Sequence, residues 1–318
     1  MAVQLIRRVV LSPFAAIYGL VTLLRNYSYD IGLLQSTPFD IPIVSVGNLS
    51  VGGTGKTPMV EYLINSLSKQ YSLGVLSRGY GRKTNGFLWV NDDLTPDQVG
   101  DEPLQIKINH SKIPVAVCEN RVKGIQQMLA EKPTINLILL DDAFQHRRVQ
   151  AKVSLLLTTH QHPFVNDWLM PVGRLRESRN GYQRADALIV TKCPVSIQKL
   201  PISDKPVFYA QSHYVNPVLH GYIYGFSGLA NNQVFKAHLE NNYTLSGFTS
   251  FNDHHAYSQE DVNLLEEKAN GNPLVCTQKD WVKIRHLIYS TPVHIVHVSH
   301  QFVDEASFHP WLIKRIES

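Results

Sequence analysis

Apolar positions along this chain follow two patterns that alternate. Short uninterrupted apolar runs rich in β-branched residues predict strands buried on both faces, and apolar residues spaced three or four apart predict amphipathic helices. The first pattern occurs in the run that begins at Ile41 and in segments 73–77, 114–118, 135–140, 153–158 and 187–191. The second occurs in segments 60–67, 104–108 and 122–130. This alternation predicts an α/β fold with a parallel sheet flanked by helices.

A second, smaller α/β unit is predicted toward the C-terminus. The composition becomes linker-like at 201–206, and we place a domain boundary near residue 215. Beyond it, apolar runs predict strands and a helical spacing predicts a helix, at 221–226, 274–277, 293–298 and 232–240. Ser258 with Asp261 resembles a capping box that starts a further helix. The predicted divisions are therefore 1–38, 39–214 and 215–318.

A glycine-rich turn stands between the first predicted strand and its helix. Glycines let backbone N–H groups surround phosphate oxygens, and a helix N-terminus adds positive potential. The arrangement predicts a P-loop in which Lys56 reaches the β- and γ-phosphates of ATP and Thr57 holds Mg²⁺. The nucleotide-binding residues would be Gly52, Gly53, Thr54, Gly55, Lys56 and Thr57. Ser50 occupies the position of the motif's first glycine, and the alternative is a strand–turn–helix corner with an accidental Gly-Lys-Thr.

Composition and charge add modest limits. The 318 residues are 44% hydrophobic and 18% charged, which describes a folded protein. The formal net charge of +4 is mild and does not indicate nucleic-acid binding, which usually requires a concentrated basic face. The 3 cysteines lie far apart, so they predict neither a disulfide framework nor a zinc site.

The N-terminal segment 9–24 is uncharged and mostly apolar, with Pro13 inside it and arginines on both sides. It is short for a membrane-spanning helix, which needs about 20 apolar residues. A signal peptide is rejected, because export would carry the P-loop to a compartment without ATP. Two interpretations stay open. One is a core helix, and the other is an interfacial anchor with apolar side chains in lipid, namely Phe14, Ile17, Leu20 and Leu24.

Further motifs suggest charge-bearing groups around the nucleotide. Segment 135–140 runs directly into Asp141-Asp142, the Walker B pattern, which places a carboxylate near Mg²⁺ at the sheet edge. A basic glycine-bearing loop at 78–83 begins with Arg78 and would grip an anionic substrate group or form a solvated turn. The arginines of 171–177 are candidates for neutralising a transferring phosphoryl group, although surface arginines are common.

Two P-loop classes fit the sequence poorly. GTPases read guanine with a carboxylate shortly after Asn/Thr-Lys, but here Thr191-Lys192-Cys193 is followed by Pro194. ParA- and MinD-like ATPases carry a second lysine early in the loop, where this chain has Val51. The remaining expectation is ATP-dependent group transfer, in which the acceptor needs a base. A membrane-recruited ATPase that acts as a switch or binding module is the competing interpretation.

Motifs in a fixed order connect the chain to a known family. They cover residues from about 10 to about 285 and read VGNLSVGGTGKTP, LSRGYGRK, GDEP, AVCENR, LDDAFQHRR, PVGRLRES, ADALIVTK, FNDHHAYS and TQKDWVK. With them the chain resembles the tetraacyldisaccharide 4'-kinases, which phosphorylate the lipid A precursor in Gram-negative bacteria. The family carries Thr or Ser at the position of Ser50.

The resemblance implies a peripheral enzyme on the cytoplasmic face of the inner membrane. The enzyme would transfer the γ-phosphate of ATP to the 4'-hydroxyl of an acylated glucosamine disaccharide 1-phosphate. It implies Lys56 and Thr57 as phosphate and Mg²⁺ ligands, Asp141 as the Walker B carboxylate with Asp142 beside it, and Asp101 as a base working with His254. Arg121, Gln145, Arg176 and Glu177 match positions near the phosphates or the acceptor.

Two expectations concern the histidine motif at 251–257. Because His254 lies beyond the predicted linker, domain closure would complete the site and exclude water. His255 is interpreted as structural, because adjacent side chains on a loop seldom bind one ion and no acid partner is evident.

Overall fold

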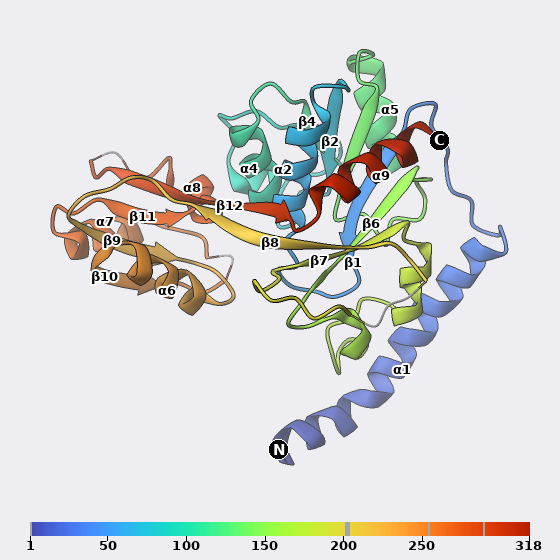
Figure 1. Cartoon of the computed structure of the whole chain (residues 1–318), viewed down its shortest axis with the longest axis horizontal. Coiled ribbons are helices and arrows are strands. Elements are labelled where there is room, and N and C mark those ends of the chain that lie inside the picture. The colour runs from blue at the N-terminus through green and yellow to red at the C-terminus, as the bar shows by residue number, and fades with distance from the viewer. Residues whose placement is uncertain (1, 201–203, 254, 289) are drawn as a thin grey trace.

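The computed structural model describes residues 2–200, 204–253, 255–288 and 290–318. Within these residues one 12-stranded sheet runs through the protein in the order β10-β9-β11-β12-β8-β7-β6-β1-β5-β2-β4-β3. Figure 1 shows the two ends of this sheet as separate bodies of α/β structure, joined by the long strands β8 and β12. The predicted α/β class with a mostly parallel sheet is confirmed.

The first half of the sheet carries the P-loop. Its central strands run parallel and are buried on both faces, as their continuous apolar sequences require. They are β1 (Ile43–Asn48), β2 (Leu73–Ser77), β4 (Val115–Val117), β5 (Leu137–Asp141), β6 (Val153–Thr159) and β7 (Ala187–Thr191), with β3 (Leu88–Trp89) as an antiparallel edge. The helices and 3-10 turns of this half are α2 (Lys56–Leu67), α3 (Pro96–Val99), α4 (Asp101–Asn109), α5 (Arg121–Glu131), η1 (Phe164–Asn166) and η2 (Arg179–Arg184).

The second half is the smaller unit that the sequence predicts. It contains β9 (Tyr222–Ser227), α6 (Asn232–Asn242), β10 (Thr244–Ser250), α7 (Gln259–Ala269), β11 (Leu274–Thr277) and α8 (Gln278–Ile284). The capping box of α7 is confirmed, because the Asp261 backbone N–H donates to Ser258 Oγ and the Ser258 backbone N–H donates to the Asp261 carboxylate.

Two long strands and the last helix connect the halves. β8 (Val207–Val215) pairs with β7 on one side and antiparallel with β12 (Val293–Phe302) on the other. The chain then returns to the first half as α9 (Glu305–Glu317), whose Phe308 and Leu312 are fully buried in the core beneath the P-loop sheet. The domain boundary at 214/215 stays a prediction. The hydrophobic core of the P-loop half contains residues from both sides of this boundary.

Helix α1 (Ala2–Asp30) projects from the first half of the molecule (Figure 1). Its apolar side chains are largely exposed, including Phe14 at 61% and Ile17 at 64%. The interpretation as a core helix is therefore wrong, because no core covers these side chains. In the described chain, Val9–Asp30 forms a helix long and apolar enough to cross a membrane by length and composition.

Candidate functional site

The turn after β1 has the backbone of a phosphate cradle. Gly52 and Gly55 adopt positive φ angles of 113° and 84°, which glycine accepts without strain. Gly55 is the N-cap of α2, and no side chain of the described residues caps this helix, so its first N–H groups remain available to an anion. Asn48 Nδ2 donates to Thr54 Oγ1 at 2.7 Å, and Thr191 Oγ1 donates to the Thr54 carbonyl at 2.8 Å. These bonds fix the loop between β1 and β7.

His300 from outside the loop also holds it, and Lys192 lies close to it. His300 of β12 donates from Nε2 to the Gly55 carbonyl at 3.0 Å, and a Cβ at Gly55 would lie 2.6 Å from this nitrogen. The Lys192 ammonium would lie 3.8 Å from a Cβ at Gly53. The space at this turn therefore requires glycine at position 55, and the C-terminal strand helps to shape the cradle.

Asp141 is the last residue of β5 and is fully buried beside the cradle. Ser77 Oγ donates to its Oδ2 at 3.1 Å, whereas its Oδ1 is buried and has no hydrogen-bond partner among the residues that the structure describes. Burial, and next the charge of Asp142, raise the pKa of this carboxyl. An unsatisfied buried carboxylate oxygen, on a side chain close enough to Lys56 for that charge to act on it, fits a hard cation such as Mg²⁺.

In the described residues no group of three or more His, Cys, Asp or Glu side chains is arranged to hold a metal ion.

Asp142 forms a charged bridge with two cations. Arg176 Nη1 donates to both carboxylate oxygens at 2.9 and 3.0 Å, and Lys56 Nζ lies 3.7 Å from Oδ1. Burial acts to raise the pKa of Asp142, but the charges of Lys56 and Arg176 outweigh it and the pKa is lowered. The carboxylate therefore keeps both cations at the mouth of the P-loop.

Asp101 is the first residue of α4 and forms an ion pair with a lysine from the other half of the molecule. Lys283 Nζ of α8 lies 3.6 Å from Asp101 Oδ2, and both side chains are buried. Burial lowers the pKa of Lys283, while Asp101 opposes this shift. The predicted partner His254 lies outside the described residues, so the pairing of Asp101 with His254 stays a prediction.

Glu102, for which the motifs predicted no role, lies among the charges around Asp141 and Lys56. Burial, and next the charge of Asp141, raise the pKa of Glu102 to about 7, while Lys56 acts in the opposite direction. This residue therefore stands among the same charges as the P-loop lysine and the Walker B carboxylate. Lys283 was missed too, since its contact with Asp101 joins two distant segments. The motifs GDEP and TQKDWVK contained both residues and were the signal that could have found them.

A cavity of about 420 Å³ lies beside this cluster and is strongly basic. Arg121 lines it from the first turn of α5, is buried, and donates from Nη1 to the Cys118 carbonyl at 2.8 Å. Its Nε and Nη2 have no hydrogen-bond partner within the described parts of the chain. Burial lowers the pKa of Arg121 to about 10, and Asp141 opposes this. The cavity also receives Arg25, His146, Arg147 and Arg148, and Arg78 is near enough for its charge to act on Arg121.

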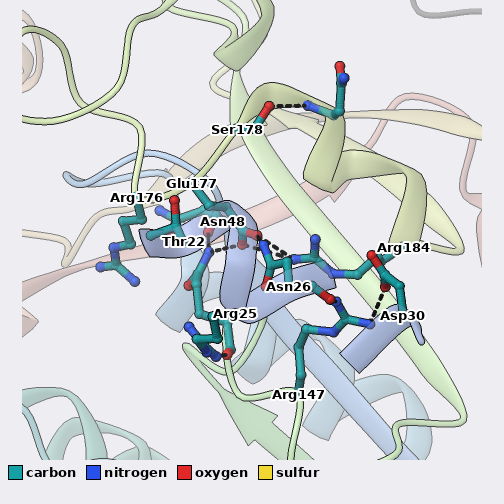
Figure 2. Close-up of polar contacts among 12 residues, drawn as sticks. Thr22, Arg25, Asn26, Asp30, Asn48, Arg147, Arg176, Glu177, Ser178 and Arg184 are labelled. Carbon is teal, nitrogen blue, oxygen red and sulfur yellow. Dashed lines mark hydrogen bonds and ion pairs between the residues drawn. The ribbon is translucent and has the colours of Figure 1, made fainter. Parts of the chain in front are cut away.

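Gln145, Arg176 and Glu177 form a wall beside the P-loop, and Figure 2 shows Arg176 and Glu177 close to Asn48 at the end of β1. Gln145 Nε2 donates to the Asn48 carbonyl at 2.9 Å and to Glu177 Oε1 at 3.0 Å. Glu177 is buried and also accepts two bonds from Arg184 Nη2 at 2.8 and 2.9 Å. The structure thus brings the three residues together beside the P-loop. Their contact with a substrate remains a prediction.

His255 has partners that fit a structural role. Its ring stacks on Phe251 with centroids 4.6 Å apart, and its Nε2 lies 3.0 Å from Asp261 Oδ2. The expectation that this histidine has no acid partner is wrong, because Asp261 of the α7 capping box provides one.

The comparisons with known proteins agree over nearly the whole chain. The family model for tetraacyldisaccharide-1-P 4'-kinase matches residues 7–317. The tetraacyldisaccharide 4'-kinase of Flavobacterium johnsoniae is 36% identical over 98% of both chains, and that of Flavobacterium psychrophilum is 38% identical over 98% of this chain and 97% of its own. The crystal structure of LpxK from Aquifex aeolicus in complex with ATP matches with a TM-score of 0.83 and 30% identity, covering 97% of this chain and 99% of that one. The chain therefore belongs to the tetraacyldisaccharide 4'-kinase family of ATP-dependent kinases.

Proposed function

We propose that this protein transfers the γ-phosphate of ATP to the 4'-hydroxyl of an acylated glucosamine disaccharide 1-phosphate, which yields lipid IVA. The observation that carries the proposal is the convergence of Lys56, Asp141 and Asp142 on the P-loop of a chain that matches this family from residue 7 to 317. The solved relative from Aquifex aeolicus contains ATP, which supports a nucleotide in the same turn.

The P-loop residues would bind the triphosphate through the backbone N–H groups of 52–57 and through Lys56. Thr57 and Asp141 would hold Mg²⁺, which neutralises charge on the β- and γ-phosphates when it is bound. Arg176 and Lys56 already stand together at Asp142, so both cations are in place to stabilise negative charge on the transferring group.

The acceptor requires a base, because a sugar hydroxyl is too weak an acid to lose its proton unaided at neutral pH. Asp101 would accept this proton, with His254 as its partner. The basic cavity beside Arg121 would receive the anionic acceptor, since its guanidinium presents two buried nitrogens that other protein groups leave unsatisfied in the described chain. Closure between 39–214 and 215–318 stays a hypothesis, and the contact of Lys283 with Asp101 already joins the two halves at this site.

A transfer assay tests the function directly. The protein is incubated with γ-labelled ATP and the acylated disaccharide 1-phosphate in detergent micelles, and the label in the lipid is counted. We expect label in the product and an ATP consumption that depends on the acceptor. Equal ATP hydrolysis with and without the acceptor, with no labelled lipid, would instead support the membrane-recruited ATPase.

The exposed face of α1 is proposed to bind the lipid surface at the cytoplasmic face of the inner membrane. Phe14→Ser together with Ile17→Ser is expected to weaken binding to vesicles of phosphatidylethanolamine and phosphatidylglycerol by about 100-fold or more. The reason is that each buried apolar side chain contributes about 1.5 kcal/mol or more. Vesicle sedimentation measures the effect. The matched control is Val234→Ser on α6, which removes a side chain of similar exposure, 55%, from another surface. Equal losses in both variants would exclude α1 as the membrane contact.

A further inference from the structure

Helix α1 makes two hydrogen bonds to consecutive residues of the wall beside the P-loop. The Tyr18 hydroxyl donates to the Arg176 carbonyl at 2.6 Å. About two turns further along the helix, Asn26 Nδ2 donates to Glu177 Oε2, also at 2.6 Å. Figure 2 shows Asn26 directed toward Glu177 and Arg184. The inner face of α1 is thus bonded to the segment that carries Arg176, while its apolar side chains remain exposed.

The segment that α1 contacts is itself bonded to the P-loop. Arg176 N donates to the Leu49 carbonyl at 2.7 Å, and Val51 N donates to the Arg174 carbonyl at 2.9 Å. The Arg176 guanidinium binds both oxygens of Asp142, which lies beside Lys56. A displacement of this segment would therefore move a cation and a carboxylate of the phosphoryl site together.

The buried carboxylate of Glu177 depends on the side chains that donate hydrogen bonds to it. The carboxylate is 2% exposed and accepts bonds from Asn26, Gln145 and Arg184. Gln145 extends the network to the Asn48 carbonyl at the end of β1. Loss of one donor to a buried carboxylate costs more than loss of an exposed contact, because water does not replace it. Asn26 is the donor that α1 contributes.

We propose that α1 has a second role besides lipid contact, in which Asn26 and Tyr18 are positioning residues that hold Arg176 against Asp142. This role rests on the proposed kinase function. The helix that meets the membrane is then also part of the frame of the phosphoryl-transfer site, and turnover requires α1 to be seated on residues 176 and 177.

The test compares Asn26→Ala and Tyr18→Phe with the full-length wild type in the micellar transfer assay. We expect kcat to fall by about 10- to 100-fold, since a misplacement of about 1 Å costs this much. The KM for ATP should change less than threefold, and vesicle binding should be unchanged. Asn26→Gln, which keeps the amide donor, should retain more activity than Asn26→Ala. The matched control is Ser28→Ala, whose hydroxyl bonds to the Leu24 carbonyl within α1.

A double-mutant cycle separates positioning from a general structural role. In an Arg176→Ala background, Asn26→Ala should cost less than a further twofold in kcat, because its effect acts through Arg176. Fully additive losses, a kcat unchanged by Asn26→Ala, or a loss of vesicle binding that parallels the loss of kcat would each overturn the proposal. A wild-type enzyme that labels no lipid would instead refute the proposed function, so the two failures are distinguishable.

Discussion

Lys56→Ala is expected to lower kcat/KM for phosphoryl transfer by about 10³- to 10⁴-fold, which corresponds to about 4–5 kcal/mol of transition-state stabilisation. The ammonium stands at the N-terminus of α2 and lies 3.7 Å from Asp142, so its removal takes away one of the two cations that would stabilise charge on the transferring group. Asp142 keeps its two bonds to Arg176, and we therefore expect the variant to remain folded. The transfer assay and a thermal melt measure the two effects.

The matched control for this prediction is Lys69→Ala. Lys69 is exposed just beyond the other end of α2 and has the same charge. It should leave both the rate and the melting temperature unchanged. A loss smaller than tenfold at Lys56 would mean that the turn after β1 does not bind the triphosphate in the proposed way.

Strands with continuous apolar sequences could be predicted closely from the sequence. Segments 73–77, 187–191 and 274–277 have the bounds that the structure shows for β2, β7 and β11. Every residue of these strands is buried, and a strand that is buried on both faces has a continuous apolar sequence, which a local pattern can predict. The place of Asp141 at the end of β5 was predictable for the same reason.

Elements that depend on distant partners were missed. No element was predicted at 207–215, the residues of β8, whose sequence includes Gln211, Ser212 and His213 and whose residues are mostly half-buried. What stabilises it is antiparallel pairing with β12, far along the chain. α9 was also missed, although Phe308, Leu312 and Ile316 recur at helical spacing and are buried. Local pattern alone does not show that this helix returns to the first half.

The residues of the site also fall into those predictable from a local motif and those that depend on distant contacts. The residues of the P-loop and the Walker B strand are local motifs, and their geometry follows from one strand and one turn each. The contact of Lys283 with Asp101 and the bond from Asn26 to Glu177 join segments that no spacing relates. The charge environment of Glu102, which raises its pKa to about 7, likewise exists only once β5 and α4 are packed together.

Asp101→Ala is expected to lower kcat by about 10²- to 10⁴-fold, the usual contribution of a general base. The substitution also has an effect on stability, because it removes the carboxylate that pairs with the buried ammonium of Lys283. Removing one partner of a buried ion pair lowers the free energy of unfolding by about 3–5 kcal/mol. The single variant is therefore expected to unfold at a lower temperature than the wild type.

The variant that resolves this is Asp101→Asn combined with Lys283→Met, which removes both charges and keeps the volume of both side chains. We expect its melting temperature to return close to that of the wild type, since no unpaired buried charge remains. The transfer rate should stay low, because an amide does not accept the proton of the sugar hydroxyl. If the rate instead recovers together with the stability, Asp101 holds α4 against α8 and the base lies elsewhere. A stable, inactive double variant assigns the proton transfer to Asp101, and the ion pair with Lys283 then supports the carboxylate from the second half of the molecule.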